Sequence, residues 1–171
     1  MEHAVEFCSA GTVHPSLLAR RLARRAVQKA VTRALERPGD RVTVRYRRGM
    51  RGVERAFVSG VDLVVVYFHR RRDRPVIVRR AERYLRQGGR LLALHASTAS
   101  FRGNETWSRL LGGRFAGHGP VADHALRRAC SREAPAGDLP DRIELRDEAY
   151  RHELTARVDV WYRWDDGEPA V

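Results

Sequence analysis

Residues 61–68 read VDLVVVYF, and this segment decides the fold of the 171-residue chain. It is apolar almost without interruption, a pattern typical of a strand that is covered on both faces. Cover on both faces predicts helices beside this strand. Pro75 to Gln87 supplies one of them, because apolar residues recur on one helical face and Gly88-Gly89 ends the pattern.

Other strands and helices alternate with this pair along the chain. Ala4 to Ser9, Val42 to Tyr46 and Leu91 to Leu94 are predicted strands, and Leu17 to Leu35 is a predicted amphipathic helix. The Arg-rich segment Arg47 to Gly52 is interpreted as a loop. Short connections between alternating elements predict an α/β fold with a doubly wound, mostly parallel sheet flanked by helices, of the flavodoxin-like type.

The region after residue 94 predicts shorter elements. Asn104 is a candidate cap for a helix that ends near Leu111. Less regular strands are predicted at Arg114 to Ala116, Ala125 to Cys130, Ile143 to Leu145 and Arg157 to Trp164. The length and the hydrophobic content of 43% predict a single domain over residues 1–171.

The composition narrows the class of protein. No apolar run approaches the ~20 residues of a membrane helix, and no secretory signal begins the chain, so we expect a cytoplasmic protein without membrane contact. Cys8 and Cys130 are too few for a disulfide scaffold. The net charge of +12 raises nucleic acid as a partner for the Arg20 to Lys29 helix face, but this is a minor alternative because no binding motif is present.

Histidines follow three of the predicted parallel strands. His14 follows the first, His69 the third and His95 the fourth. Because ligands of open α/β sheets bind beyond the carboxyl ends of the strands, these imidazoles are predicted at one edge. His69 begins the run HRRRDR, which is typical of a solvated loop, and is excluded. His95 ends an apolar strand, where an imidazole needs a partner or a ligand.

Two later segments carry a resemblance to a known family. Residues 91–118, LLALHASTASFRGNETWSRLLGGRFAGH, and DEAY at 147–150 resemble the GLHA, LLGG-x-F-x-GH and DELY motifs of the ThuA-like, or trehalose-utilisation-like, family. The resemblance extends roughly from Asp62 to Tyr150. It implies a fold similar to class I glutamine amidotransferases, and a function in carbohydrate metabolism with a disaccharide, keto-sugar or other small sugar derivative as ligand.

The resemblance also places the later motifs at the same edge as the histidines. His95, His118 and Glu148 are the candidate catalytic residues, because imidazole and carboxylate groups transfer protons near neutral pH. The candidate substrate-binding residues are His14, Phe101, Arg102, Asp147 and Tyr150. A divalent metal is a candidate cofactor, which His14, His95 and His118 would hold if one is bound.

The resemblance sets limits on the chemistry. His95 occupies the place of the nucleophilic cysteine of class I glutamine amidotransferases, and an imidazole cannot replace a thiolate that forms a thioester, so glutaminase activity is not expected. The family's His-Pro step before the DELY motif is absent, since the chain reads Ala134-Pro135, and its C-terminal segment is expected to be missing. The leading hypothesis is a hydrolase- or isomerase-type sugar enzyme. The alternative is a non-catalytic binding or assembly domain. A homo-oligomer is a possible assembly of the chain.

Overall fold

The computed structural model describes residues 2–10, 25–26, 29–30, 32–33, 41–129 and 139–170. They fall into two compact units, the first within Met1–Trp107 and the second within Ser108–Val171. Of the helix predicted over Leu17 to Leu35, residues 25–26, 29–30 and 32–33 are described and are helical. His14 and Cys130 lie outside the described residues.

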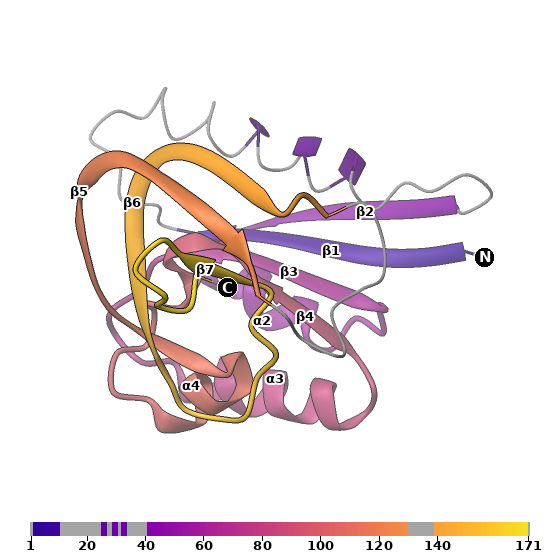
Figure 1. Cartoon of the computed structure of the whole chain (residues 1–171). Coiled ribbons are helices and arrows are strands. Elements are labelled where there is room, and N and C mark those ends of the chain that lie inside the picture. Colours follow the sequence, from indigo (N-terminus) through magenta and orange to yellow (C-terminus); the bar gives the residue numbers. More distant parts are fainter. Residues whose placement is uncertain are drawn as a thin grey trace. The chain divides into compact units, whose positions relative to one another are not determined.

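The first unit is built on a parallel sheet (Figure 1). Its elements are β1 (Glu2–Ala10), β2 (Arg41–Arg48), α2 (Gly49–Ala56), β3 (Leu63–Phe68), α3 (Pro75–Arg86), β4 (Arg90–Ala93) and the single 3-10 turn η1 (His95–Ser97). The four strands are parallel and lie in the order β2, β1, β3, β4. This order is that of a doubly wound sheet, so the predicted α/β fold is confirmed.

The core of the first unit forms around β3. Val64, Val65 and Val66 have no exposed surface, as expected for a strand covered on both faces. On one face Val65 packs with Val5 and Phe7 of β1. The helices α2 and α3 contact each other and the sheet, and they bury apolar side chains that include Val53, Ala56, Ile77, Val78 and Ala81.

The start of α2 differs from the prediction. The interpretation of Arg47 to Gly52 as a loop is wrong, because β2 continues to Arg48 and α2 begins at Gly49. Gly49 has a φ of +70°, which lets the chain turn at once from strand to helix. Met50, Val53 and Ala56 then form a buried stripe at helical spacing. Burial of this stripe outweighs the low helix propensity of two glycines.

The helix α3 confirms the prediction for Pro75 to Gln87. It has Pro75 in its first turn and ends at Arg86, before Gly88 with a φ of +87°. The Tyr84 hydroxyl lies 3.1 Å from the carbonyl oxygens of both Val61 and Arg90. These contacts connect the end of α3 to the entrances of β3 and β4.

The helix α4 (Glu105–Leu111) crosses from the first unit into the second. The Trp107 N–H donates to Asn104 Oδ1 at 2.8 Å, so the predicted N-cap is confirmed. Among the helices of the described residues, none combines the length and the apolar character that crossing a bilayer requires.

The second unit is an antiparallel sheet of β5 (Gly113–Arg128), β6 (Arg142–Leu154) and β7 (Tyr162–Trp164), in the order β6, β5, β7. The two short strands predicted at Arg114 to Ala116 and Ala125 to Cys130 are parts of one strand, β5, as far as the described residues extend. Gly117, Gly119 and Pro120 lie at the irregularities of its pairing with β6. The strand predicted at Arg157 to Trp164 is reduced to its last three residues.

Candidate functional site

His95 lies where β4 turns into η1, at the carboxyl edge of the parallel sheet. Its φ is +51°, a left-handed conformation that is uncommon outside glycine. The exposed ring accepts the Ala96 N–H at Nδ1, at 2.6 Å, and stands edge-on to Tyr67 with 6.2 Å between the ring centroids. Because Nδ1 accepts, a neutral His95 carries its proton on Nε2 and is a donor there.

Two buried serines hold this turn against the end of β3. The Ser97 hydroxyl donates to the Val66 carbonyl at 3.0 Å and accepts the Phe68 N–H at 3.2 Å. The Ser100 hydroxyl donates to the Phe68 carbonyl at 3.1 Å and accepts the Arg70 N–H at 3.0 Å. Side-chain hydroxyls thus replace strand pairing at the edge and position the loop that carries His95.

Phe101 was expected at the ligand surface, but the structure places it in the core. Its ring is 1% exposed and contacts Phe68 and Trp107, with centroid distances of 5.5 and 5.2 Å. Its φ of +51° turns the chain so that the ring points inward. Phe101 therefore anchors the loop after His95 to the core and is not part of the ligand surface.

His69 requires a correction. It was excluded as part of a solvated loop, yet its side chain is half-buried directly after β3. The backbone N–H of His69 donates to the Ala10 carbonyl at 3.3 Å. Burial, with smaller contributions from Arg71 and His95, lowers the pKa of His69. His69 therefore lies close enough to His95 for their charges to interact. Its position directly after a buried strand indicated a place at the edge of the sheet. The arginines that follow it favoured the interpretation as a solvated loop instead.

The second unit gathers a separate set of aromatic and acid–base groups. Glu148, Tyr150 and His152 alternate along β6 and so share one face. His118 of β5 is paired with Tyr150, and Phe115 with His152, and the irregularity between them lets both β5 side chains reach this face. The Tyr150 ring lies 5.4 Å from the His118 ring and 4.8 Å from the Phe115 ring.

His118 and Glu148 form an imidazole–carboxylate pair within this set. His118 Nδ1 lies 3.6 Å from Glu148 Oε1 and 2.8 Å from the Gly119 carbonyl oxygen. Since a carbonyl can only accept, Nδ1 carries the proton and Nε2 of neutral His118 has the free lone pair. The imidazole is stacked on Tyr150 at an interplanar angle of 17°. The pair can take a proton at Nε2 and stabilise the resulting cation with the carboxylate.

Residues 147–150, the DEAY motif, lie inside β6. Asp147 is exposed, and its Oδ1 accepts the Glu148 N–H at 2.8 Å. The strand assignment follows from pairing with β5, which matches Asp147 with Ala122 and Glu148 with Val121. Strand geometry separates the two neighbouring carboxylates onto opposite faces.

His152 belongs to this set and was missed in the sequence. Burial lowers its pKa, and its ring lies 6.3 Å from that of Tyr150. The alternation of Glu148, Tyr150 and His152 was a signal, but it is useful only once residues 142–154 are known to form a strand.

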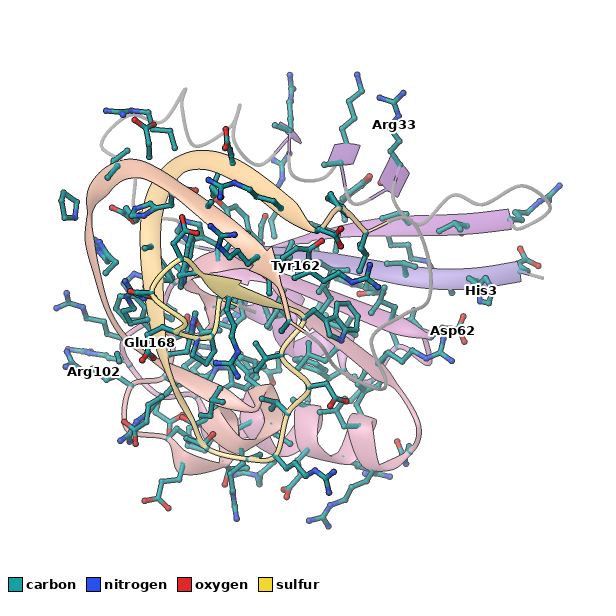
Figure 2. All side chains as sticks on the ribbon, viewed as in Figure 1. His3, Arg33, Asp62, Arg102, Tyr162 and Glu168 are labelled. Carbon is teal, nitrogen blue, oxygen red and sulfur yellow. The ribbon has the colours of Figure 1, made fainter. Side chains whose placement is uncertain are left out.

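The structure brings together His118, Glu148 and Tyr150 in the second unit, and it places His95 with His69 in the first. Within the described ranges, no three His, Cys, Asp or Glu side chains are grouped as a metal ion would require. Arg102 is exposed, and Figure 2 shows its side chain extending away from the ribbon. The buried thiol of Cys8 is unsuited to nucleophilic chemistry, because burial and Glu6 raise its pKa to about 12.

Comparison with known proteins agrees with this architecture. The profile of the ThuA family, described as trehalose utilisation, matches residues 22–168. A ThuA-like protein of Parabacteroides merdae superposes with a TM-score of 0.69 at 14% identity, over 99% of this chain and 74% of its own. One of Bacteroides uniformis superposes with a TM-score of 0.63 at 14% identity, over 92% and 66%. The curated proteins give no match.

Proposed function

Because this chain belongs to the ThuA family, we propose that the protein acts on a sugar or an oxidised sugar derivative by proton transfer, in a hydrolysis or an isomerisation in the cytoplasm. His118 and Glu148 are the proposed acid–base pair, and His95 is the proposed third catalytic group. Both reaction types move protons between hydroxyl and carbonyl oxygens or carbon atoms, and imidazoles do this near neutral pH.

The arrangement of His118 beside Glu148 is the observation that carries this proposal. With Nδ1 directed at the Gly119 carbonyl, Nε2 is the basic atom, and the carboxylate at 3.6 Å stabilises the imidazolium once it forms. His95 has the opposite tautomer, because Nδ1 accepts the Ala96 N–H. The protein therefore carries one imidazole suited to accept a proton and one suited to donate to an oxygen atom.

The aromatic rings next to His118 favour a carbohydrate as the ligand over a small inorganic anion or a peptide. Tyr150 and Phe115 are partly exposed and lie 4.8 Å apart. Aromatic faces pack against the C–H faces of sugar rings, and few polar groups then set the orientation. Arg102, which is exposed, and His14 are further proposed substrate contacts. Asp147 is not proposed as a contact, because it lies on the opposite face of β6 from Glu148 and Tyr150.

A screen of keto-sugars and disaccharides with matched variants tests the proposal. We expect turnover by the wild type and a loss of about 100-fold or more in His118→Gln, which removes the proton-accepting nitrogen and keeps a polar side chain of similar size. We expect a similar loss in His95→Asn, because asparagine tolerates the positive φ and the fold is therefore preserved. The measurements are product formation and thermal unfolding.

His3→Gln is the control, because Figure 2 shows His3 towards the amino end of the strands, away from the carboxyl edge. Its turnover should equal that of the wild type. Unchanged turnover in both His118→Gln and His95→Asn would remove the proposed roles. Sugar binding by the wild type without any product would instead favour the alternative, a binding domain on the same fold.

A further inference from the structure

The two loops that follow β3 and η1 form one rigid rim at the carboxyl edge of the first unit. The Phe101 N–H donates to the Arg70 carbonyl at 2.7 Å. The Asn104 side chain donates to Asp73 Oδ2 at 2.9 Å. With the Ser100 contact to Arg70 already described, these bonds join residues 69–74 to residues 98–104 at three places. The charged side chains of this rim therefore have a fixed backbone beneath them.

The side chains of this rim carry a strong excess of positive charge. Its two loops contain the arginines 70, 71, 72, 74 and 102, and a single acid, Asp73. The carboxylate of Asp73 already accepts from Asn104. Elsewhere in the same unit arginines have acidic partners, as in Arg80 with Glu54 and Arg86 with Glu82. No such ion pair is formed by the rim arginines with any residue that the structure describes.

The positive charge extends to the imidazoles at the edge. Arg71 is close enough to His69 to disfavour its protonated form, and His95 acts in the same direction. His95 is a donor at Nε2 in its neutral form, because its Nδ1 accepts the Ala96 N–H. Imidazole N–H groups beside guanidinium groups are suited to bind an anion, because both kinds of group can donate hydrogen bonds to it.

We propose that the sugar derivative carries an anionic group, a carboxylate or a phosphate, that binds at this rim through Arg71 and Arg102 beside His69 and His95. The inference rests on the proposed function and specifies its substrate class. Arginine binds both anions with paired N–H donors. A neutral disaccharide would leave these guanidinium groups without a counter-charge.

Calorimetric titration with four probes tests this class: D-gluconate, glucose 6-phosphate, D-glucose and trehalose. We expect at least one anionic probe to bind about tenfold or more tightly than glucose, with an affinity that falls as salt is added. The two anionic probes distinguish a carboxylate site from a phosphate site. Binding should also raise the pKa of His69, measured by NMR, because a nearby anion favours the imidazolium.

Matched variants locate the site. Arg71→Gln and Arg102→Gln should each weaken binding of the anionic probe about tenfold and leave binding of glucose unchanged. Arg83→Gln is the control, because Arg83 is exposed in the last turn of α3, far along the helix from the rim. Equal losses in Arg83→Gln and Arg71→Gln would overturn the proposal, because the effect would then reflect only net charge.

The outcomes separate this inference from the proposed function. If glucose or trehalose binds as well as the anionic probes and depends on His118, the anionic substrate class is wrong while the sugar function stands. If no sugar binds, charged or neutral, both are wrong. Inorganic phosphate is titrated as a reference ligand, and if it binds as tightly as glucose 6-phosphate, the proposed binding of a sugar derivative at this rim is wrong.

Discussion

At the scale of single residues, the buried carboxylate of Glu6 depends on one partner. Glu6 has no exposed surface in the centre of β1, and Arg47 of β2 donates to it at 2.5 and 2.7 Å. Burial alone would raise the pKa of Glu6, but the hydrogen bonds and charge of Arg47, with smaller contributions from Ser59 and Arg45, lower it. Glu6 is therefore ionised within the core, where an unpaired charge is costly.

Removal of Arg47 should be strongly destabilising. We expect Arg47→Met to lower the free energy of unfolding at pH 7 by about 3 kcal/mol, at the low end for a broken buried pair because the Arg47 side chain is 30% exposed. Urea unfolding monitored by circular dichroism measures this change. The double variant Glu6→Leu/Arg47→Met should recover most of the loss. A loss below about 1 kcal/mol in the single variant would show that the pair is energetically neutral.

At the scale of elements, the turn from α3 into β4 requires two glycines for different reasons. Gly88 adopts a φ of +87°, which side chains rarely tolerate. Gly89 instead makes room, because a Cβ there would lie 2.3 Å from the Tyr84 ring. The ring cannot move freely, since its hydroxyl is bonded to Val61 and Arg90. The glycine pair thus ends the helix and also accommodates the tyrosine that anchors it.

A methyl group at position 89 tests this packing. We expect Gly89→Ala to destabilise the protein by about 2 kcal/mol, because the Tyr84 ring must shift and lose its hydrogen bonds. Chemical denaturation gives the magnitude. In a Tyr84→Leu background the same change should cost much less, since the clash is absent. Equal costs in both backgrounds would mean that the ring is not the obstacle.

At the scale of the whole molecule, each unit contains a histidine that favours its neutral form. Burial lowers the pKa of His69 in the first unit and of His152 in the second. The unfolded chain therefore takes up protons at a higher pH than the folded protein does. Stability from these groups is present above the unfolded pKa, about 6.5, and is lost as pH falls towards the lower folded values.

Acid should therefore weaken the protein before its carboxylates titrate. We expect the free energy of unfolding to fall between about pH 7 and pH 5, and the slope to be reduced in His69→Gln/His152→Gln. Urea unfolding at several pH values measures it. Identical slopes in the wild type and the double variant would show that neither imidazole is responsible. Below pH 4.5, loss of the Glu6 charge should add a second decline.

The fold was largely predictable, and the site only in part. Residues 61–68 and 75–87 have patterns that depend on near neighbours alone, and both elements were predicted correctly. The position of His95 at the carboxyl end of β4 followed from the parallel topology, although β4 is a partly exposed edge strand and not a buried one. His69 and His152 were not predicted, because their burial depends on chain segments distant in the sequence.

The amino-acid sequence by itself determined the α/β class, the helix ends at glycine and the family, because periodicity and turn residues act over a few positions. Only the tertiary structure decided that residues 113–128 form one irregular strand and that His118, Glu148 and Tyr150 share a face. Register between β5 and β6 produces that face. Register arises from the pairing of distant segments and the bulges that shift it, which no local pattern encodes.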